Sequence, residues 1–168
     1  MKKFFVFSLV VLTATAVLAH PHFRKTTSVT LPGDVEASVA FFTVPSNMSH
    51  AEKAENGAFL SPGLPKLKIS TDLKAGSASI PAGTYTVGAI KNSMTDWTMV
   101  LSPGELGFGD KPDMSKLIKL DSQFNKGAPV EHLVVDIFPG SGKAAGKVVV
   151  LLGFGDMWLD GVLTEVAE

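Results

Sequence analysis

The chain contains no cysteine among its 168 residues. That absence excludes disulfide bonds, zinc sites built on cysteine, thiol catalysis and the cysteine that a bacterial lipid anchor requires. The chain also has little net charge, with 15 basic against 16 acidic residues and a formal charge of −1. A chain so evenly balanced lacks the basic excess of proteins that bind nucleic acid or anionic membranes, and we expect neither as the main partner.

The first nineteen residues have the three parts of a secretory signal peptide. Lys2 and Lys3 form a basic start, residues 4–12 are almost all apolar, and the small residue Ala19 offers a cleavage site. The apolar stretch is shorter than the roughly 20 residues that span a bilayer, and no later segment is long or apolar enough to do so. We therefore predict cleavage after Ala19 and a soluble periplasmic or secreted protein with no membrane anchor.

Residues 20–168 are dominated by short segments with the alternation and β-branched content of strands, and are predicted to form a single exported domain. About nine strands are expected, at 26–31, 35–44, 66–73, 84–91, 96–102, 116–124, 130–138, 147–154 and 157–166. One short helical turn is expected over 50–56. This pattern predicts an all-β fold, a single antiparallel β-sandwich that is jelly-roll-like or a partly closed barrel.

The connections between these strands are rich in Gly and Pro. The segment Ile80 to Tyr85 predicts a tight β-hairpin, because its proline presets φ for a turn and its glycine tolerates the left-handed conformation. Gly155 and Asp156 are expected to separate the last two strands. The sequence leaves open whether the loops 57–65 and 103–115 form a site or only connect strands.

Several ordered segments together resemble a known family. They are HPHF after the leader, TDLKAG at 71–76, IPAGTYTV at 80–87, DWTMVL at 96–101, EHL at 131–133 and LLGFG at 151–155. With these segments the chain resembles bacterial exported proteins of the domain of unknown function family 2911. It lacks the Trp-Arg-x-Gly-Ala-Asn segment that many members carry, which makes it a divergent or subgroup member. The resemblance implies an exported β-sandwich-like domain and implies no reaction.

Cleavage after Ala19 places a histidine at the mature N-terminus. The α-amine and ring nitrogen of His20 together suit copper, and His22, His50 or His132 is available as a second ligand. The square-planar motif with histidine in third position is disfavoured, because it needs a backbone N–H that Pro21 lacks. Copper is thus the one cofactor that the residue types suggest.

Met48 and His50 add a thioether and an imidazole two residues apart, a pairing that suits soft metals if the segment is extended. The alternative is that Met48 packs and His50 starts the short helix, exposed to solvent.

His132 lies in a strand whose two faces both mix apolar and polar residues, so we expect a largely buried strand and a histidine satisfied by a hydrogen bond rather than a ligand. Asp136 shares its face and is placed to orient the imidazole. The aromatic residues Tyr85, Trp97 and Trp158 are predicted to pack in the core rather than to form a sugar-binding platform.

No motif of a hydrolase, nucleotide-binding protein or calcium-binding protein is present in the sequence. The favoured interpretation is a non-enzymatic binding or structural domain of the bacterial periplasm. The alternative is a periplasmic copper-binding protein that uses His20 with a second histidine. An enzyme with copper redox chemistry is a third hypothesis.

Overall fold

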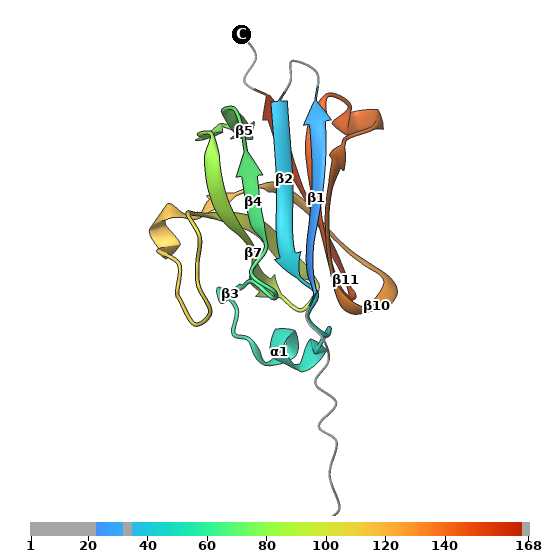
Figure 1. Cartoon of the computed structure of the whole chain (residues 1–168). Helices are drawn as coiled ribbons and strands as arrows, with labels where there is room; N and C mark the ends of the chain where they lie inside the picture. The colour runs from blue at the N-terminus through green and yellow to red at the C-terminus, as the bar shows by residue number, and fades with distance from the viewer. Residues whose placement is uncertain (1–22, 32–34, 166–168) are drawn as a thin grey trace, which may run out of the picture.

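A computed structural model describes residues 23–31 and 35–165, and the predicted leader and mature N-terminus lie outside these ranges. The described chain is a sandwich of two antiparallel sheets with little helix (Figure 1). The predicted all-β antiparallel sandwich is therefore confirmed. Among the described residues there is no helix with the length and apolarity needed to cross a membrane.

The first sheet orders its strands β1-β2-β4-β7-β8-β9, with β3 paired to β7. Their bounds are β1 Arg24–Leu31, β2 Val35–Phe42, β3 Phe59–Leu60, β4 Lys66–Ile69, β7 Gly83–Ser93, β8 Asp96–Pro103 and β9 Ile118–Lys119. The second sheet runs β10-β11-β5-β6. Its bounds are β5 Leu73–Ala75, β6 Ala78–Ile80, β10 Asp121–Pro139 and β11 Lys147–Glu165. Short 3-10 turns occupy Met114–Lys116 and Gly142–Ala144.

Alternation of side chains produces the core between the sheets. In β2, Val35, Ala37, Val39 and Phe41 are buried while the residues between them are exposed or half-buried. The partner face comes mainly from the second sheet, where Leu133, Val135 and Ile137 of β10 are buried. This period-two pattern is what a sheet with one face in the core requires.

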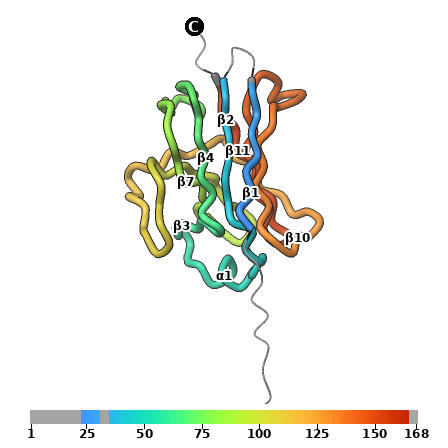
Figure 2. Tube along the Cα trace, viewed as in Figure 1, coloured from blue at the N-terminus to red at the C-terminus, as the bar shows by residue number. Residues whose placement is uncertain are grey.

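β10 and β11 are each 19 residues long, and their course is visible in Figure 2. The predicted break at Gly155 is wrong, because Gly155 continues the strand at φ +60° opposite Val130. The irregularities lie instead on β10, whose register with β11 shifts twice around Val130. Extra residues on one strand of a pair bend it without ending it, which is why a glycine that resembles a turn lies inside a strand.

The bent part of β10 also pairs with the end of the first sheet. Leu133 N donates to Val44 O at 2.8 Å and Ser46 N donates to Glu131 O at 2.8 Å. A second junction forms beyond β9, where Leu120 N donates to Met99 O at 3.0 Å. The two sheets are therefore joined at two places, within β10 and just before its first residue.

The predicted hairpin at Ile80–Tyr85 is wrong, because β6 and β7 belong to different sheets. The segment is a corner that crosses from one sheet to the other. The hydroxyl of Tyr85 donates to Pro81 O at 2.6 Å, and Ala82 N donates to Asp72 Oδ1 at 2.8 Å. Proline and glycine suit a corner as well as a hairpin, so the local turn signal does not specify which strand follows.

The helix α1 spans Met48–Lys53, earlier than the predicted turn over 50–56. It begins after Asn47, whose Oδ1 accepts a hydrogen bond from Ser49 N at 3.1 Å. An asparagine N-cap stabilises a helix start more than a residue without a side-chain acceptor. α1 lies at the end of the sandwich near β3 and beside the ends of β1 and β2 (Figure 1).

Candidate functional site

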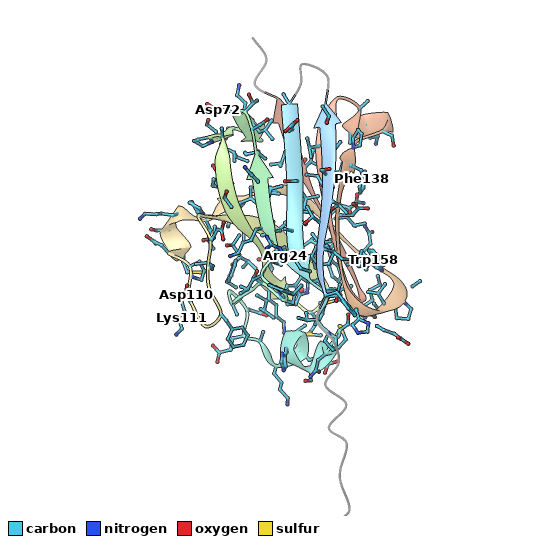
Figure 3. All side chains as sticks on the ribbon, in the orientation of Figure 1. Arg24, Asp72, Asp110, Lys111, Phe138 and Trp158 are labelled. Atoms are coloured by element: carbon cyan, nitrogen blue, oxygen red, sulfur yellow. The ribbon has the colours of Figure 1, made fainter. Side chains whose placement is uncertain are left out.

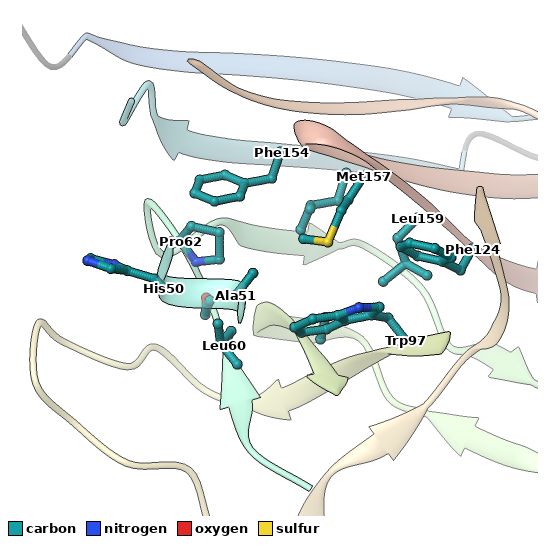
Figure 4. A pocket seen from close by; sticks show the side chains of 12 residues that line it. His50, Ala51, Leu60, Pro62, Trp97, Phe124, Phe154, Met157 and Leu159 are labelled. Carbon is teal, nitrogen blue, oxygen red and sulfur yellow. The ribbon is translucent and has the colours of Figure 1, made fainter. Parts of the chain in front are cut away.

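A cavity of about 240 Å³ lies between α1, the loop around β3, strands β7 and β8 of the first sheet, and the inner face of the second sheet. Figure 4 shows the side chains that surround it. The lining residues come from positions 50 to 159 of the chain: His50, Ala51, Leu60, Ser61, Pro62, Ala89, Trp97, Phe124, Leu152, Phe154, Met157 and Leu159. Most are hydrocarbon or aromatic, so the cavity favours an apolar occupant.

α1 is only six residues long and forms one wall because a lysine holds its end. Lys91 Nζ donates to the backbone carbonyls of Ala51 at 2.8 Å, Glu52 at 3.0 Å and Ala54 at 2.8 Å. The Lys91 side chain comes from β7 and the residue is 3% exposed. An ammonium has three protons to donate, and here each has a carbonyl. Lys91 therefore fixes α1 against the sheet.

The loop 57–65, which the sequence left undecided, forms the neighbouring wall. Phe59 and Leu60 of β3 pair with β7, and Ser61 Oγ donates to Val87 O at 2.6 Å. Gly88 permits this approach, because a Cβ there would lie 2.3 Å from Phe59 Cε2. The loop is thus a built part of the site and not merely a connection.

The polar groups of the cavity are few. Ser61 already donates its hydroxyl proton to Val87 O. The imidazole of His50 points away from the other lining side chains in Figure 4. Trp97 is 4% exposed, and its Nε1 has no hydrogen-bond acceptor within the part of the chain that the structure describes. A buried indole N–H normally has a partner, so this donor is available to a ligand.

The charged ammonium of Lys91 lies next to the cavity and is stabilised by backbone carbonyl dipoles. Lys91 Nζ lies over the Trp97 ring, 5.9 Å from its centroid, and the ring face attracts a cation at this distance. Its three protons are all engaged by carbonyls. Among the described lining residues there is no Asp, Glu, Lys or Arg, so nothing in the wall pairs with an ionic ligand.

Of the predicted metal ligands, the structure describes Met48, His50 and His132. His20 and His22 lie outside the described residues. His50 is exposed on α1, and His132 is exposed on β10 opposite Pro45. Within residues 23–31 and 35–165, no group of three His, Asp or Glu side chains could hold a metal ion.

The prediction of a buried His132 is wrong, and so is that of a strand buried over most of its length. Only alternate residues of this part of β10 are buried, and His132 lies on the outer side. Asp136, expected to orient the imidazole, accepts a hydrogen bond from the backbone N–H of Ile137 at 2.8 Å. The face of the strand that contains His132 is the outer face, and it carries apolar residues although it is partly exposed.

Met48 and His50 line different pockets, so they do not form the suggested soft-metal pair. The segment is helical, and residues two apart on a helix do not share a face. Met48 is half-buried with its sulfur against Gly155, where a Cβ would lie only 2.2 Å from Sδ. Its role is packing, which was the alternative interpretation.

Of the three aromatic residues predicted to pack in the core, two are buried there and Trp158 is not. Tyr85 and Trp97 are buried as predicted. Trp158 is half-buried and packs on glycine backbone, with its Nε1 donating to Ala128 O at 3.0 Å. Its indole N–H is therefore satisfied, in contrast to that of Trp97.

The loop 103–115 is separate from the cavity, and Figure 3 shows Asp110 and Lys111 far out on it. Lys66 Nζ holds its base by donating to Leu106 O and to Thr86 Oγ1. Burial lowers the pKa of Lys66 from its ordinary value, while Glu105 and Asp110 oppose that shift. This loop connects β8 to β9 and contributes no residue to the cavity wall.

Sequence reasoning missed Lys91 and the cavity. The one signal for Lys91 was a lysine within the apolar run VGAIK at 87–91, a position where a charged side chain needs a specific partner. The lining residues as a set gave no signal, because they are spread over six separate parts of the chain between residues 50 and 159.

Comparison of the chain with protein-family models, with curated proteins and with solved structures finds no match. The resemblance to family 2911 therefore remains a prediction that rests on the sequence segments alone. The function is argued below from the geometry of the site.

Proposed function

We propose that this protein is a non-enzymatic binding domain that holds a small, uncharged, apolar molecule in the cavity beneath α1. The observation that carries the proposal is an apolar cavity of about 240 Å³ whose wall contains one buried donor without a partner. A single unsatisfied polar group in an otherwise apolar pocket is the usual arrangement of a ligand site.

The absence of catalytic side chains from the wall supports binding rather than chemistry. General acid–base catalysis needs a titratable group within hydrogen-bond reach of the reacting atoms. The described wall offers only His50 of that kind, and its imidazole points outward (Figure 4).

We further propose that binding takes place outside the cytoplasm. Support comes from the sequence of residues 1–19, with its basic start, apolar run and small residue at the end. The same proposal makes the chain a divergent member of family 2911, on the segments described above.

Titration with naphthalene, followed by calorimetry, tests the binding function. We expect one site in the wild type and at least a tenfold loss of affinity in Ala89→Leu, which adds three carbon atoms to the cavity wall. Ala78→Leu is the matched control, because Ala78 is exposed on β6. Equal affinity in all three proteins means that naphthalene binds outside the cavity, and it contradicts the proposal.

Copper binding is kept as a second candidate because Phe23, the fourth residue of the predicted mature chain, lies near the strand of His132. Phe23 N donates to Thr43 Oγ1 at 3.1 Å, and Thr43 N donates to Phe23 O at 2.8 Å. Two residues further on, Pro45 is paired with His132. Phe23, three residues after His20 in the sequence, is thus joined by hydrogen bonds to the segment that pairs with His132.

A copper(II) titration read by electron paramagnetic resonance tests this candidate. The samples are the signal-processed protein, the same protein with one residue added before His20, and the variants His132→Ala and His50→Ala. One-to-one binding that is lost in the extended protein and in His132→Ala, but kept in His50→Ala, supports an N-terminal copper site. Binding that is indifferent to the extension removes it.

A further inference from the structure

The wall of the cavity specifies more about the ligand than that it is apolar. We propose that the ligand is an uncharged bicyclic aromatic molecule with one hydrogen-bond acceptor directed at Trp97 Nε1. This inference rests on the proposed binding function and names the class of molecule for the same cavity.

The size of the molecule follows from the volume. A dry engineered cavity of about 150 Å³ holds one benzene molecule. The present cavity, at about 240 Å³, is larger by roughly the volume that a second fused ring requires. A single ring leaves part of the wall without contacts, and empty space in a packed interior forfeits dispersion energy.

The aromatic character follows from the side chains that face the space. Trp97 of the first sheet faces Phe154 and the thioether of Met157 across the space, and Phe124 lies beside Leu159 (Figure 4). Aromatic rings attract other rings in offset or edge-to-face arrangements, and methionine sulfur contacts ring edges favourably. A planar ring system meets these surfaces better than a flexible chain does, and it loses less conformational entropy when bound.

The acceptor follows from the orphaned donor. In Figure 4 the indole nitrogen of Trp97 lies on the side of the ring nearest Met157 and Leu159, both of which line the space. Trp97 is 4% exposed and its N–H has no acceptor in the described chain. An acceptor atom on the ligand restores a hydrogen bond that folding otherwise leaves unmade.

The absence of charge on the ligand follows from the rest of the wall. The described lining contains no Asp, Glu, Lys or Arg, and the ammonium of the neighbouring Lys91 donates its three hydrogen bonds to backbone carbonyls. A carboxylate or an ammonium in this space therefore loses its water without gaining a partner.

Quinoline and naphthalene form a matched pair of probes, since they have the same shape and only quinoline carries an acceptor. At about pH 8, where quinoline is neutral, we expect it to bind the wild type about three- to tenfold more tightly than naphthalene, as one hydrogen bond allows. In Trp97→Phe this preference disappears. In Trp158→Phe it is retained, because the Trp158 N–H already has a partner.

The two indole N–H signals in a nitrogen–proton correlation spectrum give a second readout that needs no cavity variant. Trp158→Phe assigns them, since the chain has two tryptophans. We expect quinoline to move the Trp97 indole proton downfield by a hydrogen-bond shift that naphthalene does not cause.

The outcomes separate this inference from the proposed function. If neither probe binds the wild type, the binding function itself is overturned. If both bind with equal affinity and quinoline leaves the Trp97 proton where naphthalene leaves it, the acceptor is overturned while binding stands. If pyridine binds as tightly as quinoline, the bicyclic size is overturned.

Discussion

Replacing Lys91 by methionine tests whether this lysine holds α1 against the cavity. Methionine keeps the unbranched apolar stem, and it removes the ammonium that donates to the carbonyls of Ala51, Glu52 and Ala54. Nothing else in the described contacts of α1 supplies donors to the end of the helix besides its own backbone. The variant therefore isolates the lysine's three hydrogen bonds.

The magnitude is a difference between two opposing terms. Three hydrogen bonds from a charged donor contribute roughly 5–9 kcal/mol together. Keeping an ammonium away from water costs several kcal/mol, and the variant no longer bears that cost. We expect a net loss of about 2 kcal/mol in the free energy of unfolding, which lowers Tm by about 4–8 °C in a domain of this size.

Urea unfolding and amide hydrogen exchange measure this loss. Lys68→Met is the control, because Lys68 is exposed on β4 of the same sheet. If α1 opens separately from the sandwich, the amide of Ala54 exchanges roughly thirtyfold faster in Lys91→Met while Tm changes less. Unfolding curves and α1 exchange rates that match those of Lys68→Met refute the role assigned to Lys91.

Three further predictions concern stability. Gly88→Ala places a Cβ 2.3 Å from Phe59 Cε2, and we expect a loss of about 1–3 kcal/mol in a urea titration. Tyr85→Phe removes the hydrogen bond to Pro81 O and costs about 1 kcal/mol at neutral pH. Because burial raises the pKa of Tyr85, the wild type also loses stability as pH rises beyond about 10, and Tyr85→Phe lacks that part of the alkaline loss. Burial likewise raises the pKa of Asp160, so its ionisation opposes folding above the ordinary Asp pKa. Asp160→Asn should therefore be more stable than the wild type at pH 7, with an advantage that fades as pH falls toward about 4 and that a pH series of thermal melts will reveal.

Most of the structure that the sequence predicted correctly was predicted from the alternation of apolar and polar residues along single strands. The pattern in Val35 to Phe41 identified both the strand and its buried face, because a period of two is local and needs no knowledge of the partner strand. The corner at Pro81 and the long strand through Gly155 were not predictable in this way. Each feature depends on which strands lie beside it. Proline and glycine indicate only that the backbone can bend or turn there, and they do not specify which strand follows.

The candidate site was less accessible to sequence reasoning than the fold. Trp97 was predicted to be buried, but whether its N–H has a partner depends on every atom around it. Lys91 and the carbonyl of Ala51 that it contacts are forty residues apart, and such pairs leave no periodic trace. The packing of Met48 was one of the two interpretations that the sequence offered, whereas the exposure of His132 was not expected, because the mixed composition of its strand suggested burial on both faces.

The most direct test of the account is to locate a bound ring by NMR. The protein is labelled on its methyl groups, saturated with naphthalene, and examined for intermolecular nuclear Overhauser effects. The account predicts effects from the ring protons to the methyl groups of Ala89, Leu60 and Met157, which line the cavity. Effects confined to exposed methyl groups such as those of Met94 and Met114 contradict it.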